Sequence, residues 1–199
     1  MKTIDNRRNL LKDDLKETVR KDSRVAIAAS HFSIYAYQAL KEQLEAISEF
    51  RFIFTSASFT TEKASKAKRE FYIPQLNREK TLHGSEYEIK LRNELTQKAI
   101  AKECAEWVRR KGFFKTNISQ EQMSGFLYVD NGKEQYTYLP VNGFTTVDLG
   151  CEKGNNLTGL LTRFEGPITR EYLKFFDEIW LDHTRVSSPV RLFPFSQPK

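Results

Sequence analysis

The chain has 199 residues, of which 39% are hydrophobic and 29% charged, a composition typical of a globular domain with its own core. No run approaches the roughly 20 apolar residues of a membrane span, residues 1–8 lack the apolar segment of a signal peptide, and two cysteines are too few for a disulfide framework, so we expect a cytoplasmic protein without a membrane partner. The net charge of +6 arises within residues 61–115, which hold 14 Lys/Arg and 8 Asp/Glu, and this excess predicts an anionic partner, nucleic acid first.

The first part of the chain is expected to form a parallel βαβ unit. Apolar residues spaced at four predict a preceding helix over residues 9–20. An apolar run at 24–29 predicts a buried strand, an apolar stripe predicts a helix over 34–47, and an aromatic run at 50–55 predicts a second strand. A strand, a helix and a strand within roughly 30 residues predict two adjacent, parallel strands joined by the helix.

A long loop and a long helix are expected in the middle of the chain. Residues 56–82 lack periodicity, and loops of this length are often functional. Residues 85–111 are expected to form the longest helix, and their apolar positions lie on two faces. The helix is therefore expected either to bend or to pack on two sides.

The second half of the chain alternates as a sheet does. Two runs at 125–129 and 134–139 flank Asn131-Gly132, which predicts a hairpin. Residues 157–164 predict a further strand, and Thr169 is expected to begin a helix with one apolar face. These elements predict an α/β fold.

Catalytic motifs are sparse. The sequence has no GxxxxGK[ST], GxGxxG or GxSxG motif, and we expect no cofactor and no metal site. The histidines His31, His83 and His183 each stand without the ligand spacing of a zinc site. His31 follows the first strand at the start of a helix, where ligands often bind in α/β sheets. It is either a site residue or an ordinary polar residue at a helix start.

One short motif keeps a nuclease open as an alternative. Glu88 and Lys90 form a Glu-x-Lys pair, which resembles that of metal-dependent restriction-type nucleases. In those enzymes the pair projects from a strand and an aspartate lies upstream. Here the context predicts a helix, and no aspartate lies between Asp22 and Asp130.

The basic excess supplies the candidates for nucleic-acid binding. Exposed cations contact phosphates and position nucleic acid without reading its sequence. A solvated face with ordinary salt bridges, or stabilisation of the end of the long helix, would account for the same residues. The candidates are Arg69, Arg78, Lys80, Lys98, Lys102, Arg109, Arg110, Lys111 and Lys115.

Several stretches together resemble the phospholipase D superfamily, in the form found at the N-terminus of some bacterial superfamily II helicases. Residues 25–34 resemble the first strand and helix start of that family, and residues 50–54 resemble its second strand. Residues 175–180 are similar to its closing helix. The resemblance covers residues 9–182 and implies a phospholipase D-like fold, which has a mixed, partly parallel sheet with helices on both faces.

The same resemblance implies that the phosphodiesterase site is degenerate. Met123 and Gly125 fall where the family has His-x-Lys, and Asn142-Gly143 falls where its loop has Ser-Asn. Asp148 stands where that loop has glycine. Covalent catalysis needs the imidazole, and the charge of the transition state needs the cation. We therefore expect no catalytic residue at these positions.

A single phospholipase D-like domain is thus expected over residues 1–185, with residues 186–199 as a flexible tail or a linker to a downstream helicase region. The expected function is that of a non-catalytic accessory domain, which binds nucleic acid, DNA first, or docks on the helicase core in a DNA-processing or restriction-type system. The ATPase motors would belong to the rest of the parent chain. A protein-interaction module, for example a homodimer, is the alternative from a different class, next to the metal-dependent nuclease.

Overall fold

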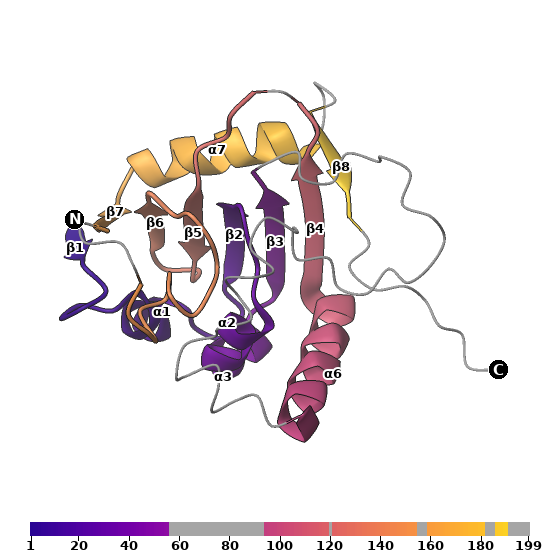
Figure 1. Ribbon diagram of the computed structural model, residues 1–199. Coiled ribbons are helices and arrows are strands. Elements are labelled where there is room, and N and C mark those ends of the chain that lie inside the picture. Colours follow the sequence, from indigo (N-terminus) through magenta and orange to yellow (C-terminus); the bar gives the residue numbers. More distant parts are fainter. Residues whose placement is uncertain (56–93, 120, 155–158, 182–185, 191–199) are drawn as a thin grey trace.

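The computed structural model describes residues 1–55, 94–119, 121–154, 159–181 and 186–190, with the backbone alone for residues 94–98 (Figure 1). The helices and strands of these residues are, in chain order, β1 (Lys2–Ile4), α1 (Leu11–Thr18), β2 (Arg24–Ala29), α2 (Ile34–Ala39), α3 (Lys41–Ala46), β3 (Glu49–Phe54), α6 (Glu94–Lys111), β4 (Gly112–Asn117), β5 (Phe126–Asp130), β6 (Gln135–Leu139), β7 (Leu161–Glu165), α7 (Ile168–Leu181) and β8 (Ser187–Pro189).

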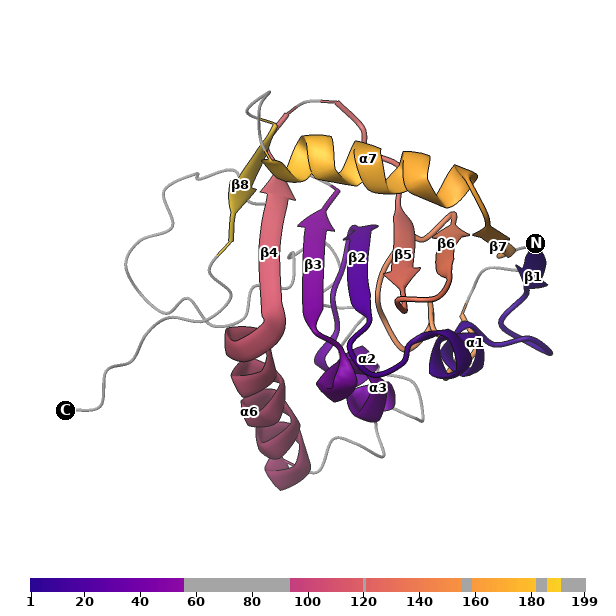
Figure 2. The same ribbon diagram turned by 180° about the vertical axis from the view of Figure 1, so that it is seen from behind.

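One eight-stranded sheet has the strand order β1-β7-β6-β5-β2-β3-β4-β8 (Figures 1 and 2). β2, β3 and β4 are parallel neighbours, and the other pairs are antiparallel. The predicted parallel pairing of the first two strands is confirmed, with Ala26 opposite Arg51. The predicted hairpin is confirmed as β5 and β6. The chain therefore has an α/β fold with a mixed, partly parallel sheet.

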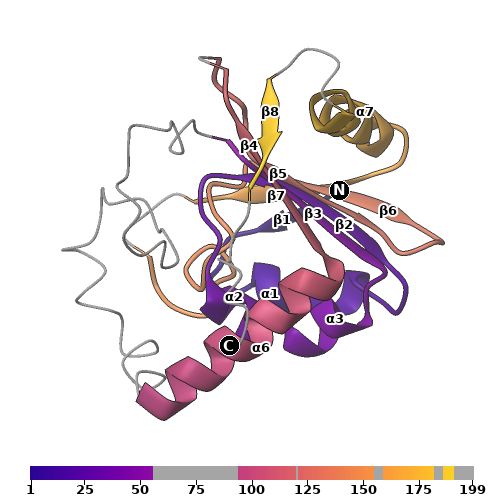
Figure 3. The ribbon, with the colours of Figure 1, turned by 90° about the vertical axis from the view of Figure 1, so that its right-hand side faces the viewer.

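Helices cover both faces of this sheet, as predicted. α1, α2, α3 and α6 lie on one face, and α7 lies on the other (Figure 3). Side chains alternate along β2, so that Val25, Ile27 and Ala29 enter the larger core while Ala26 and Ala28 pack on the α7 side. β2 is thus buried on both sides, which explains its continuous apolar run.

Aromatic side chains fill the larger core. The ring centroid of Phe32 lies 5.4 Å from that of Phe114 and 5.7 Å from that of Phe52. Trp107 of α6 is fully buried, and its indole N–H donates to the backbone oxygen of Leu44 at 2.8 Å. Because a buried indole N–H needs a partner, this bond fixes α6 against α3. None of the described helices is long and apolar enough to cross a membrane.

One helix predicted in the first half of the chain is divided in the structure. The single helix predicted over 34–47 is two helices, because Leu40 leaves the helical conformation (φ −120°, ψ 22°). Each helix then directs its own apolar residue into the core, Tyr37 from α2 and Leu44 from α3. The predicted loop over 56–82 and the first part of the long helix lie outside the described residues.

Three strands, β1, β4 and β8, were not predicted. β4 begins directly after α6 and alternates between an exposed Phe113 and a buried Phe114. β8 pairs Ser187 with Asn117 of β4, so the sheet continues beyond the boundary expected at residue 185. This part of the predicted tail is a strand, and residues 191–199 lie outside the described residues.

Candidate functional site

The carboxyl ends of the parallel strands form one edge of the sheet, where ligands usually bind in α/β folds. Ser30, Thr55 and Asn117 stand at or just beyond these ends. The backbone N–H of Thr55 donates to the oxygen of Ala29 at 3.1 Å, and the Asn117 side-chain amide donates to the oxygen of Thr55 at 3.2 Å. This edge therefore carries polar side chains on a fixed backbone.

The loop that follows β6 closes over the end of β2. The backbone N–H of Ser30 donates to the oxygen of Asn142 at 2.9 Å, and the N–H of Phe144 donates to the oxygen of His31 at 2.8 Å. A third bond runs from the N–H of Ser33 to the oxygen of Phe144 at 3.0 Å. Two segments more than a hundred residues apart in sequence are thus locked side by side.

Two of the four degenerate active-site positions, Asn142 and Gly143, lie on the clamped loop, and a third, Gly125, contacts the residue before Asn142. Gly125 and Val141 are bonded through their backbones, since the N–H of Val141 donates to the oxygen of Gly125 at 2.9 Å. A Cβ at position 125 would lie only 1.8 Å from the oxygen of Val141. Asn142 is exposed, Gly143 is buried, and Met123 packs against the smaller core under α7. No side chain fits at position 125 unless the loop moves.

His31 is held by its neighbour in sequence. Ser30 Oγ lies 2.6 Å from His31 Nδ1 and donates to the backbone oxygen of Asn142, also at 2.6 Å. His31 itself is exposed. The cap of α2 is Ser33, whose Oγ accepts from the N–H of Tyr35 at 3.2 Å. Capping of a helix therefore does not explain the orientation of His31.

Three of the predicted nucleic-acid contacts have partners within the chain. Arg110 Nη2 lies 3.0 Å from Glu45 Oε2, and Lys111 Nζ donates to the backbone oxygen of Glu45. Lys115 Nζ donates to the backbone oxygen of Trp180 and lies 5.2 Å from the centre of its ring. These contacts fasten α6 to α3 and β4 to α7, which favours a structural role for all three cations.

Two predicted contacts, Lys102 and Arg109, are exposed on α6. The side chain of Lys98 and the other predicted cations, Arg69, Arg78 and Lys80, lie outside the described residues. So do Glu88 and Lys90, the pair that motivates the nuclease alternative. Among the described residues, no three His, Cys, Asp or Glu side chains gather as metal ligands do.

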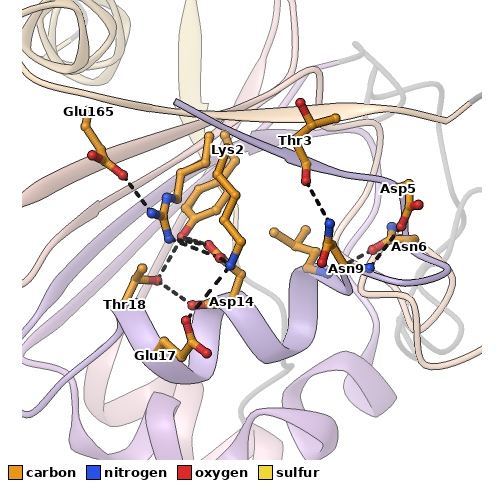
Figure 4. Close-up of polar contacts among 12 residues, drawn as sticks. Lys2, Thr3, Asp5, Asn6, Asn9, Asp14, Glu17, Thr18 and Glu165 are labelled. Atoms are coloured by element: carbon orange, nitrogen blue, oxygen red, sulfur yellow. Dashed lines mark hydrogen bonds and ion pairs between the residues drawn. The ribbon is translucent and has the colours of Figure 1, made fainter.

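A buried ionic cluster joins β1 and α1 to the neighbouring strands β7 and β6 (Figure 4). The Asp14 carboxylate accepts from Lys2 Nζ at 2.5 Å, from Arg163 Nη1 at 3.0 Å and from the Tyr138 hydroxyl at 2.8 Å. Burial by itself raises the pKa of Asp14, but the bonds from Lys2, Tyr138 and Arg163 outweigh it and leave the pKa below its usual value. Since the buried Asp14 carboxylate accepts from three donors of the chain itself, the cluster has a structural role.

Sequence reasoning missed this cluster although a signal was present. The apolar stripe of α1 runs through Leu11 and Leu15, and Asp14 lies on the same buried side as Thr18. A carboxylate on an apolar stripe needs a buried cation as partner. The sequence does not show which cation that is, because Arg163 lies far along the chain.

No protein-family profile fits the chain, and no curated protein is significantly similar to it.

Proposed function

We propose that this chain is a non-catalytic accessory domain of a helicase, with a phospholipase D-like fold, and that it binds nucleic acid. The observation that carries the absence of catalysis is the contact between Gly125 and Val141, where the added Cβ would lie 1.8 Å from a backbone oxygen. A phosphodiesterase of this type needs a cation at that position to stabilise the transition state. Backbone fills the space instead.

The charge of the chain supports nucleic acid as the partner. The net charge is +6, and three cations of the basic segment are engaged in contacts within the chain. Lys102 on α6 is therefore the best described candidate for a phosphate contact. Each phosphate contact releases counterions, so that binding weakens with salt at a slope of about −0.9 per contact on duplex DNA.

Fluorescence anisotropy with a short labelled nucleic acid over a salt series tests this proposal. The change Lys102→Gln is expected to lower the slope of log affinity against log salt by about one unit while the melting temperature stays unchanged. The matched control is Lys174→Gln, which also removes an exposed charge, from α7 on the opposite face of the sheet. Wild-type protein that shows no salt-dependent binding at low ionic strength would contradict the nucleic-acid proposal.

A second candidate function, docking on a helicase core, is favoured by the outer side of α7. Ile168 and Phe175, seven positions apart, are 45% and 57% exposed. Seven residues are nearly two helical turns, so the two side chains lie on one stripe. If docking through this stripe is the function, Phe175→Ser weakens association with the core without loss of stability. A homodimer would show as a doubled mass in light scattering of the isolated chain.

A further inference from the structure

The hydrogen bonds at the end of β2 determine which ring nitrogen of His31 carries the proton when the ring is neutral. Ser30 has a single hydroxyl proton, and its Oγ lies 2.6 Å from two atoms, the backbone oxygen of Asn142 and His31 Nδ1. A carbonyl oxygen only accepts, so the proton of Ser30 goes to Asn142. His31 Nδ1 must then donate to Ser30. In the neutral ring, the lone pair is on Nε2.

The ring therefore presents an acceptor to the outside. Nδ1 is turned toward Ser30, and Nε2 lies on the other side of the ring of this exposed residue. The hydrogen bonds from the His31 ring to the Ser30 hydroxyl and on to the Asn142 carbonyl set both the tautomer and the orientation of the ring. In metal-bound and catalytic histidines, the hydrogen bond made by the other ring nitrogen has the same effect. Three backbone bonds clamp the two segments that carry this chain, so the acceptor is pre-organised.

Residues 140–144 of the loop after β6, which border this edge, carry no positively charged side chain. Asn142 is exposed on the clamped loop, and its carboxamide offers a donor and an acceptor. Asp148 also lies against this part of the loop, because a Cβ added at Gly143 would lie 2.6 Å from Asp148 Oδ2. A phosphate carries acceptors only and is negatively charged, so a lone pair on Nε2 and a nearby carboxylate both disfavour it. A ligand hydroxyl matches the edge because it donates to Nε2.

We infer that the carboxyl end of β2 binds a sugar hydroxyl, with His31 Nε2 as acceptor and the Asn142 carboxamide as its neighbour, and that the chain thereby prefers RNA to DNA. This rests on the proposed nucleic-acid function and names the feature of the nucleic acid that is read. The 2′-hydroxyl is the group by which a protein distinguishes RNA from DNA. The sequence puts DNA first, and the comparison of RNA binding with DNA binding decides between the two.

The first test is the tautomer of the ring. Two-dimensional proton–nitrogen spectra of the full chain, with His31 assigned through a His31→Gln variant, distinguish a protonated Nδ1 from a protonated Nε2. The neutral ring is expected to carry its proton on Nδ1, and the change Ser30→Ala is expected to release it into a mixture. A neutral ring with its proton on Nε2 in the wild type would overturn the inference.

The second test is the preference for ribose. Single strands of the same sequence, as RNA and as DNA, are compared by anisotropy, and adenosine and 2′-deoxyadenosine are compared by the shift of the His31 signals. Wild type is expected to prefer the ribose form about tenfold, the effect of one hydrogen bond of about 1.4 kcal/mol. His31→Gln and Ser30→Ala are expected to reduce the preference, whereas Lys102→Gln weakens both strands equally.

The outcomes separate this inference from the proposed function. If RNA and DNA bind equally well to wild type, or if His31→Gln keeps the preference, the hydroxyl site is refuted and nucleic-acid binding stands. If neither strand binds, the proposed function falls, and the two nucleosides still decide the site. Inorganic phosphate that shifts the His31 signals more strongly than adenosine does would overturn the choice of a hydroxyl as ligand.

Discussion

Removing the charge of Asp14 is expected to cost the fold about 3 kcal/mol. The side chain of Asp14 is 1% exposed, and Asp14→Asn keeps its shape while it removes the counter-charge of Arg163 and Lys2. Loss of one partner from a buried ion pair costs about 3–5 kcal/mol. The lower end applies here, because Lys2 is 39% exposed and reaches water, and Arg163 keeps a contact with Glu165 at 2.7 Å.

Urea denaturation at neutral pH, followed by circular dichroism, measures this cost. For a chain of this size, about 3 kcal/mol corresponds to a fall in melting temperature of about 6–12 °C. The matched control is Asp13→Asn, on the exposed side of the same helix turn, which is expected to lose less than about 1 kcal/mol through the helix dipole. The slope of unfolding free energy against urea should be the same in all three proteins.

The difference in unfolding free energy between wild type and Asp14→Asn is expected to depend on pH. The pKa of Asp14 is lowered in the folded state, so the stabilisation is fully present above its unfolded pKa, about 3.9, and is lost as the pH falls through the folded value. The gap between wild type and Asp14→Asn is therefore expected to close in acid. A gap below about 1 kcal/mol at neutral pH, or one that does not shrink in acid, would refute the reasoning.

Three further predictions concern the packing of α6, one buried thiol and two glycines. The double change Arg110→Gln and Lys111→Gln is expected to lower the melting temperature by several degrees and to leave the salt slope of nucleic-acid binding unchanged, because both side chains hold α6 on α3. Burial raises the pKa of the Cys104 thiol to about 12, so a thiol reagent followed by mass spectrometry should modify it only after unfolding. Gly125→Ala should melt far below wild type because of the clash with the loop, whereas Gly132→Ala, with nothing within 4 Å but a φ of +82°, should cost about 1–2 kcal/mol.

Elements with a clear period were predictable from sequence. The continuous apolar run of β2 identified a strand buried on both faces, and Asn131-Gly132 identified the turn between β5 and β6. The spacing of Tyr172, Phe176 and Trp180 identified the buried side of α7. In each case the local pattern and the burial in the fold agree, so the sequence alone was sufficient.

The missed strands lack such a pattern. β1 and β8 have three residues each, too few to show an alternation, and both exist because a longer neighbour supplies the hydrogen bonds. β4 follows α6 without a turn residue other than Gly112, and its signal merged with the end of the helix. Strands of this kind are defined by their partners, which no local window contains.

The candidate site was predictable only in part. The position of His31 after the first strand was visible, as was the absence of His-x-Lys. The contact of Ser30 with the carbonyl of Asn142 was not visible, because it depends on a loop more than a hundred residues away. The same limit applied to the basic segment, where Lys111 and Lys115 looked available until the structure placed backbone oxygens beside them.

The position of the loop after β6 explains two features: no side chain fits at position 125, and His31 Nδ1 has to donate to Ser30. This loop is held at Val141 by Gly125 and at Asn142 by Ser30. A side chain at position 125 would push Val141 outward and carry the adjacent carbonyl of Asn142 away from Ser30. The hydroxyl of Ser30 would then be free to donate to His31 Nδ1, and Nε2 would become a donor. On the function proposed above, residue 125 therefore affects both the expected loss of catalysis and the ligand inferred for this edge.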